Sequence, residues 1–107
     1  MQQNHGEKIA EKFLRKLGYD IIERNFRVHM VGEVDLICLD GKEIVFVEVR
    51  ERSRKDFGNP EESVGRRKFF KIVMVAEIYL GSSVRNWRVD VVAICNGRVE
   101  HLKGAAL

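Results

Sequence analysis

Two carboxylates interrupt two otherwise apolar stretches of this 107-residue sequence. Asp35 stands within residues 34–39, and Glu48 stands within residues 44–49. A buried carboxylate without a partner is costly, so each acid should be protonated, paired with a cation or bound to a metal ion. Clustered carboxylates suit Mg²⁺ or Mn²⁺, which prefer carboxylate and water oxygens. The pair therefore indicates a divalent-metal site, and pairing of Asp35 with Arg50 is the structural alternative.

The two acids can cooperate only if their strands pair in a suitable register. Residues 33–39 and 43–50 are predicted strands joined by a tight turn at Asp40-Gly41. With these two residues at the turn centre, Asp35 is the diagonal neighbour of Glu48; with the centre one residue later, the acids lie directly opposite each other. Because alternate strand residues share a face, either register places four charged side chains on one face. They are Glu33, Asp35, Glu48 and Arg50.

The remaining elements follow from hydrophobic spacing and from turn and cap signals. Asn59 and Pro60 resemble the cap and first residue of a helix that ends at Gly81. The predicted elements are a helix over 6–17, strands over 20–28, 33–39 and 43–50, a helix over 60–80, and strands over 87–94 and 99–102. This order, in a chain of ordinary globular composition, predicts a single α/β domain over residues 1–107.

The positive charge of the chain is concentrated in one segment. The formal net charge is +3, yet residues 50–71 hold eight Lys and Arg against four Asp and Glu. Such a local excess attracts nucleic acid, although a solvated helix face and a charged loop would produce the same pattern. The candidate nucleic-acid-binding residues are Arg52, Arg54, Lys55, Arg66, Arg67, Lys68 and Lys71.

Several other classes of protein do not fit the composition. The apolar stretches are too short to cross a membrane, and the polar residues 1–8 do not resemble a secretory signal. Cys38 and Cys95 lie in apolar runs and match no zinc-site spacing. We therefore expect reduced cysteines in a cytoplasmic protein.

A series of short motifs runs through the whole chain. They are Gly6-Glu7-x-x-Ala10, Gly18-Tyr19, Arg24-Asn25-x-Arg27, Gly32-Glu33-Val34-Asp35-Leu36, Val45-Phe-Val-Glu-Val-Arg50, Gly58-x-Pro60, Lys68 and Arg88-Val89-Asp90-Val91-Val92. In content and order they resemble the YraN-like family of bacterial proteins. That family is similar to the PD-(D/E)XK nuclease superfamily and, in layout, to archaeal Holliday-junction resolvases.

The resemblance implies a restriction-endonuclease-like fold, with a mixed sheet flanked by helices. It also implies an endonuclease that uses Mg²⁺ or Mn²⁺ and acts on DNA rather than RNA, and the resolvase layout implies a homodimer. Asp35 and Glu48 would bind the metal, with the Val49 carbonyl as third ligand and Glu7 as an additional acid. Two roles stay open, because Glu7 also fits a helix capping box and Glu33 is either a metal ligand or a supporting residue.

The sequence departs from the superfamily pattern at one position. The pattern has a lysine two residues after the glutamate, where this chain has Arg50. An arginine can orient a phosphate, but it does not lose a proton to assist the attacking water. Lys68 is the candidate for the missing amine. Two functions therefore remain open: a nuclease acting on structured or branched DNA, and a nuclease fold that binds nucleic acid without turnover.

Overall fold

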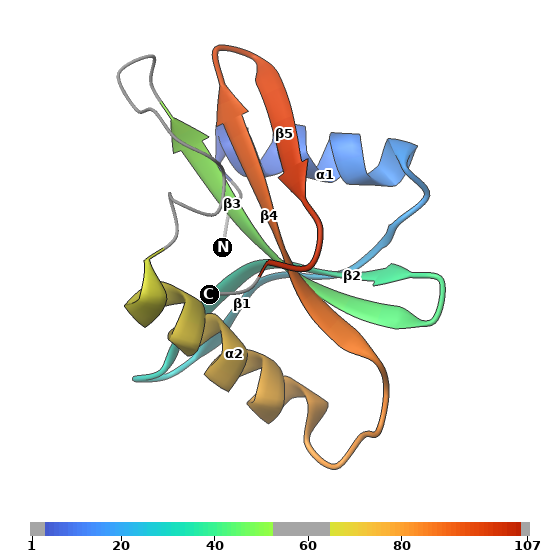
Figure 1. Cartoon of the computed structure of the whole chain (residues 1–107), viewed down its shortest axis with the longest axis vertical. Coiled ribbons are helices and arrows are strands. Elements are labelled where there is room, and N and C mark those ends of the chain that lie inside the picture. The colour runs from blue at the N-terminus through green and yellow to red at the C-terminus, as the bar shows by residue number, and fades with distance from the viewer. Residues whose placement is uncertain (1–3, 53–64, 106–107) are drawn as a thin grey trace.

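The computed structural model describes residues 4–52 and 65–105 and has the predicted order of elements (Figure 1). The elements are α1 (His5–Lys16), β1 (Asp20–Val28), β2 (Gly32–Asp40), β3 (Glu43–Arg52), α2 (Arg66–Leu80), β4 (Trp87–Cys95) and β5 (Arg98–Leu102). The helix expected from Pro60 begins later, at Arg66, with Gly65 as its N-cap. Asn59 and Pro60 lie outside the described residues. No described helix is long and apolar enough to cross a membrane.

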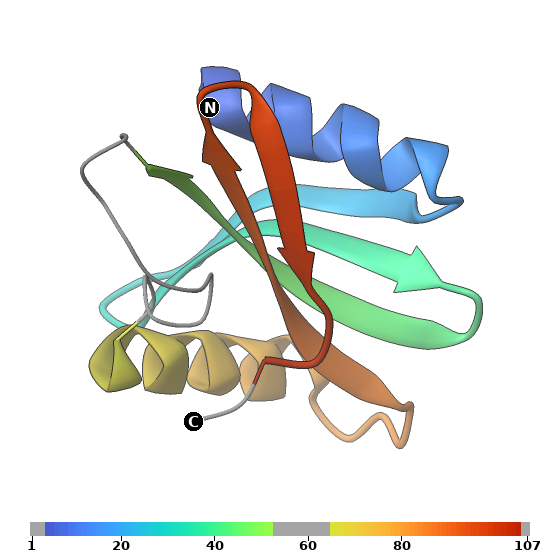
Figure 2. The same cartoon turned by 45° about the horizontal axis from the view of Figure 1, so that its top comes forward.

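The five strands form one sheet in the order β1-β2-β3-β4-β5. Only β3 and β4 run parallel, because the connection between them crosses over and carries α2. Helix α1 covers one face of the sheet and α2 the other, as Figure 2 shows most clearly. The predicted mixed sheet flanked by helices is confirmed.

Two apolar cores lie on the two faces of the sheet. Phe46 packs with Ile72 of α2 on one face, whereas Val45 and Val47 pack with Leu14 of α1 on the other. Strand β3 thus supplies buried side chains to both faces. This explains why its sequence is apolar at almost every position.

The register of the β2–β3 hairpin selects one of the two predicted alternatives. Asp40 pairs with Glu43, so the turn residues are Gly41 and Lys42 and the expected turn at Asp40-Gly41 is wrong by one residue. Gly41 has a φ of +63°, which a residue with a side chain rarely adopts. Extending this register past its last pair places Asp35 directly opposite Glu48.

Beyond that last pair, Leu36 with Val47, strands β2 and β3 separate. Strand β2 continues along β1 as far as Gly32, and β3 continues along β4 as far as Arg52. The two strand pairs diverge toward the left of Figure 1, and we call this divergence the strand fork. Regular alternation also breaks here, because Val34 packs on the α2 side and Leu36 on the α1 side. Regular alternation therefore does not by itself place Glu33 on the face of Asp35.

A buried ionic network holds the opposite region of the sheet together. Asp90 is fully buried and accepts hydrogen bonds from Arg88 Nε (2.9 Å) and the Gly104 N–H (3.0 Å), and its Oδ2 lies 2.7 Å from His101 Nε2. Arg88 also contacts Asp40 of the β2–β3 hairpin. The network therefore joins that hairpin, β4, β5 and the segment after β5. Burial alone would raise the pKa of Asp90, but hydrogen bonds from His101 and Arg88 outweigh burial and hold that pKa below its usual value.

We predict that Asp90→Asn lowers the free energy of unfolding by about 1–3 kcal/mol at pH 7, because it removes the buried anion that accepts from Arg88 and lies against His101, while Asp40 and Glu43 still pair with Arg88. Urea denaturation measures the change, with Asp20→Asn as a control at an exposed carboxylate. Since the pKa of Asp90 is lowered by folding, its stabilisation is present above the unfolded-state value and is lost as the pH falls through the folded-state value. Equal stability of Asp90→Asn and the wild type would contradict this role.

Candidate active site at the strand fork

Asp35 and Glu48 meet where β2 and β3 separate. Asp35 Oδ2 accepts a hydrogen bond from the Val49 N–H at 2.8 Å, so the side chain occupies the place of a ladder bond. The two carboxyl groups also share a side-chain hydrogen bond, and Glu48 is only 2% exposed. The predicted convergence of the two acids is present in the structure.

The surroundings of Asp35 favour its protonated form. Burial, then the charge of Glu48 and the nearby Glu7, raise the pKa of Asp35 to about 8, against an opposing hydrogen bond from Val49. At neutral pH Asp35 therefore favours its protonated form, which can donate a hydrogen bond to the neighbouring Glu48 side chain. Two neighbouring acids whose environment disfavours full ionisation are typical of a functional site.

The amine of Lys68 also reaches the acid pair. Its Nζ lies 2.7 Å from Glu48 Oε2, and the lysine comes from the first turn of α2. Among the described residues the partners of Asp35 do not include Arg50, and the Arg50 Nε is buried without a hydrogen-bond partner. The alternative in which Asp35 pairs with Arg50 is therefore wrong. Two acids and an amine therefore meet at the site, and the guanidinium group of Arg50, two residues after Glu48 on β3, has a buried donor without a partner among the described residues.

Both sequence interpretations of Glu7 describe its position. With Asn4 it forms the predicted capping box of α1, and it is nevertheless buried, with 6% exposed. Its charge contributes to the raised pKa of Asp35. The preceding Gly6 lies against the side chain of the exposed Glu51, so the start of α1 is close to β3.

Asn25 is a member of the site that the sequence analysis did not select. Its Nδ2 donates to Glu7 Oε1 at 3.1 Å, while its Oδ1 is buried without a hydrogen-bond partner among the described residues. The residue has a φ of 50°, in the left-handed region that asparagine tolerates better than most residues. The sequence offered two signals for it, namely an asparagine in the middle of a strand, where this residue type is uncommon, and the motif Arg24-Asn25-x-Arg27.

The structure places none of the remaining candidates whose side chains it describes at the acid pair. Glu33 lies 3.7 Å from Arg27 and lines a cavity that also includes Lys71. Arg66, Arg67 and Lys71 are exposed along α2, and Arg52 ends β3. Arg54 and Lys55 lie outside the described residues.

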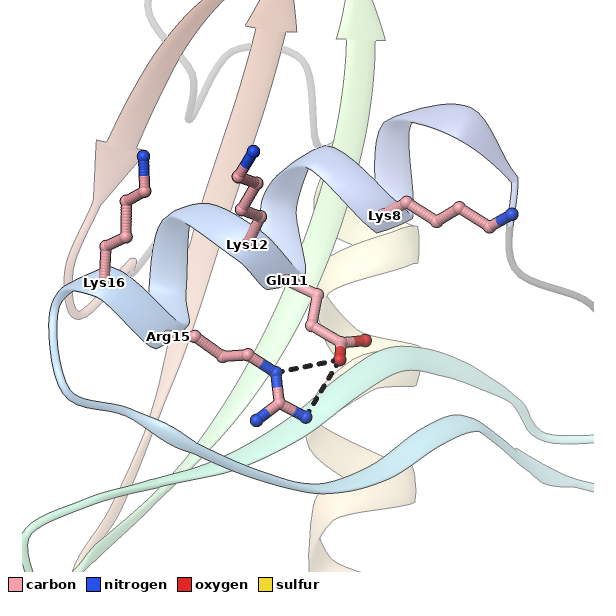
Figure 3. Close-up of a pocket in the computed structure, with 5 residues that line it drawn as sticks. All are labelled: Lys8, Glu11, Lys12, Arg15 and Lys16. Atoms are coloured by element: carbon pink, nitrogen blue, oxygen red, sulfur yellow. Dashed lines mark hydrogen bonds and ion pairs between the residues drawn. The ribbon is translucent and has the colours of Figure 1, made fainter.

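A second basic surface, which the sequence analysis did not propose, covers the outer side of α1 (Figure 3). Glu11 is bound there by Arg15 at 3.0 Å and by Arg24 at 2.7 Å. Figure 3 shows Lys12 and Lys16 extending together away from this ion pair. The arrangement is that of a solvated amphipathic helix face with an (i, i+4) pair.

In the part of the chain that the structure describes, no group of three or more His, Cys, Asp and Glu side chains has the arrangement of a metal site. Asp35 and Glu48 remain as a pair. Mg²⁺ usually keeps several waters and uses only one or two carboxylates of the protein. The donor chemistry of this pair therefore fits a hydrated hard cation.

Comparison with known proteins identifies the family. The sequence profile described as "Uncharacterised protein family UPF0102" matches residues 6–94. The chain belongs to this family. A UPF0102 protein of Moorella thermoacetica is 45% identical over 102 residues, which cover 92% of this chain and 84% of the relative. A UPF0102 protein of Persephonella marina is 42% identical over 106 residues, which cover 94% and 88%. The YraN-like assignment made from the motifs is confirmed.

We predict that Asp35→Asn stabilises this UPF0102 chain in the absence of divalent metal. The amide can accept from the Val49 N–H and donate to Glu48, as the protonated acid does, without a charge to bury. Because the pKa of Asp35 is raised by folding, its contribution to stability is full below the unfolded-state pKa and declines as the pH rises through about 8.

The stability gain of Asp35→Asn should therefore grow with pH and reach about 2 kcal/mol at pH 8, allowing for solvent near the site. Thermal and urea unfolding in EDTA between pH 5 and pH 9 measure it. A matched substitution, Asp20→Asn, should leave the pH profile unchanged. A loss of stability in Asp35→Asn at pH 8 would show that the carboxylate is a structural ion rather than a functional one.

Proposed function

We propose that this protein is a metal-dependent endonuclease of the restriction-endonuclease-like type that hydrolyses phosphodiester bonds in DNA with branched or otherwise irregular structure. The observation that carries the proposal is the meeting of Asp35, Glu48 and the Lys68 amine at the strand fork. A purely structural ion pair between Lys68 and Glu48 does not require Asp35 as a second acid beside it. The sheet would be more stable without the Asp35 carboxyl group. The arrangement is explained if the acids bind something that compensates their charge.

Asp35, Glu48 and the Val49 carbonyl are the groups that would hold Mg²⁺ or Mn²⁺. The acid pair would release its shared proton on binding, so binding should strengthen as the pH rises. When bound, such an ion supplies electrostatic stabilisation to the negative charge that develops on the phosphate.

The other roles belong to side chains of the protein. Lys68 lies in hydrogen-bond contact with Glu48 and can hold or transfer a proton there, which Arg50 cannot do. Arg50 keeps a buried donor and can orient a phosphate oxygen through its planar guanidinium group. Lysine and arginine on α2 would contact the DNA backbone and position it without reading its sequence. A spatial neighbour thus replaces the lysine that the superfamily pattern has on β3.

A second candidate is a nuclease fold that binds nucleic acid without cutting it. The Lys68–Glu48 ion pair favours this function, because a lysine ammonium can neutralise the acids in place of a metal ion. Manganese binding by calorimetry separates the two functions. A binding-only protein should take up no Mn²⁺ at millimolar concentration, whereas the nuclease should bind it with a dependence on Asp35 and Glu48. A homodimer, as in resolvases, stays a prediction for sedimentation to test.

We predict that Lys68→Met lowers the rate of Mn²⁺-dependent nicking of branched DNA by about 100-fold or more, because it removes a proton-transfer group. Lys71→Met, one turn further along α2, should change the rate only through DNA affinity. Asp35→Asn and Glu48→Gln should abolish cleavage while leaving DNA binding in EDTA within about threefold of the wild type. Equal nicking by all four variants would refute the proposed active site.

A further inference from the structure

Helix α2 exposes a large aromatic side chain in the middle of its basic surface. Phe70 is 64% exposed and stands between Arg66 and Arg67 on one side and Lys71 on the other in the helix sequence. A phenylalanine so accessible contributes little to the core and leaves apolar surface in contact with water. The exposed ring indicates a partner with an apolar surface, and the lysine and arginine residues around the ring indicate that this partner is negatively charged.

Two open cavities flank the Phe70 side chain. One, of about 430 Å³, is lined by Met30, Val31, Arg67, Phe70, Lys71 and Met74. The other is lined by Arg66, Phe69, Phe70 and Val73. Each cavity combines Phe70 with an arginine, and none of the described residues that line either one is acidic. We call this surface, formed by these two cavities, the Phe70 surface.

The tip of the β1–β2 hairpin completes the Phe70 surface. Gly32, at the start of β2, lies close to α2. A Cβ atom on this glycine would lie only 3.4 Å from the Cβ of Lys71. Met30 of the same tip is 92% exposed and has a φ of 64°. The hairpin tip lies beside the first half of α2 in both Figure 1 and Figure 2. Apolar side chains from two elements therefore frame the exposed ring.

The combination of an exposed ring with arginine and lysine suits an unpaired nucleobase and its phosphates. An aromatic ring stacks on any base, and guanidinium groups bind phosphate or stack beside the base. A second copy of this chain would bring the same cations together, which like-charge repulsion disfavours. A base held in a duplex presents its edge rather than its face, so it could not stack on Phe70.

We propose that the Phe70 surface binds an unpaired nucleobase, with Arg66, Arg67 and Lys71 on the adjoining phosphates. The inference rests on the proposed function and specifies its substrate as DNA with a single-stranded segment. Lys68, which is bound to Glu48, lies two residues before Phe70, or about 3 Å along the helix axis, and within the range of α2 residues that line the Phe70 surface. A bound single strand would thus pass close to the strand fork.

The test measures binding in EDTA, where no cleavage occurs, by fluorescence anisotropy with a labelled oligothymidine and a labelled duplex of equal length. We expect Phe70→Ala to weaken binding of the single strand about tenfold and that of the duplex less than twofold, because only the single strand loses a stacking contact. Phe70→Tyr should restore single-strand affinity. Ile78→Ala is the matched control, since Ile78 is 52% exposed on the same helix but lines neither cavity.

A spectroscopic measurement reports the same contact directly. Phe70→Trp should show fluorescence quenching by oligothymidine beyond that of the wild type, whose only tryptophan is Trp87. Equal effects of Phe70→Ala on single strand and duplex, or no extra quenching, would overturn the inference. So would a wild-type dimer in sedimentation that Phe70→Ala dissociates, because the surface would then serve self-association.

The outcomes separate this inference from the proposed nuclease function. If Mn²⁺-dependent nicking is absent but Phe70→Ala selectively weakens single-strand binding, the nuclease proposal fails and the base-binding surface stands. If nicking depends on Asp35 and Glu48 while Phe70→Ala binds both DNAs as the wild type does, the nuclease stands and the inference fails.

Discussion

The hydrogen bond from the Val49 N–H to the Asp35 carboxyl group is the constraint on which the site depends. It lies where the β2–β3 ladder ends, one residue beyond the Leu36–Val47 pair. A side chain there satisfies a backbone donor that the departing strand no longer reaches, so the sheet can divide without leaving that donor buried and unpaired. The same bond fixes Asp35 next to Glu48. The same hydrogen bond therefore accompanies the separation of the two strands and brings the acid pair together.

Among the described residues, Asp90 and the Asp35–Glu48 pair form two buried acid sites, and their surroundings differ in electrostatic character. Asp90 accepts from Arg88 and Gly104 and lies against His101, so folding favours its ionised form and lowers its pKa. Asp35 lies beside two further acids, so folding disfavours ionisation and raises its pKa to about 8. The first arrangement stabilises the protein at neutral pH. The second costs stability, and a cost of this kind is expected where charge is kept available for a ligand.

Helix α2 links this acid pair to the basic surface. Its Lys68 reaches inward to Glu48, whereas Phe70 on the same turn is directed toward solvent. Because successive helical residues are rotated by about 100°, one short segment can contact the sheet and a partner at once. The crossover that makes β3 and β4 parallel is what brings this helix to the face of the sheet on which Glu48 lies.

The sequence by itself determined the elements and the two acids. Period-two and helical spacing of apolar residues gave the order of helices and strands, because burial acts on every residue of a regular element. The conspicuous charges in apolar strands gave Asp35 and Glu48, and the pattern Asn4-x-x-Glu7 gave the cap of α1. All of these signals are local in the chain.

Only the tertiary structure decided which charges meet. The turn at Gly41-Lys42 set the register that places the two acids opposite each other, and the regular alternation of β2 breaks between Val34 and Leu36. Packing of α2 placed Lys68, rather than Arg50, against Glu48, and packing of α1 brought Glu7 and Asn25 to the fork. These contacts join residues that are far apart in sequence. Which residues meet depends on how the helices and strands pack, and hydrophobic periodicity does not encode that packing.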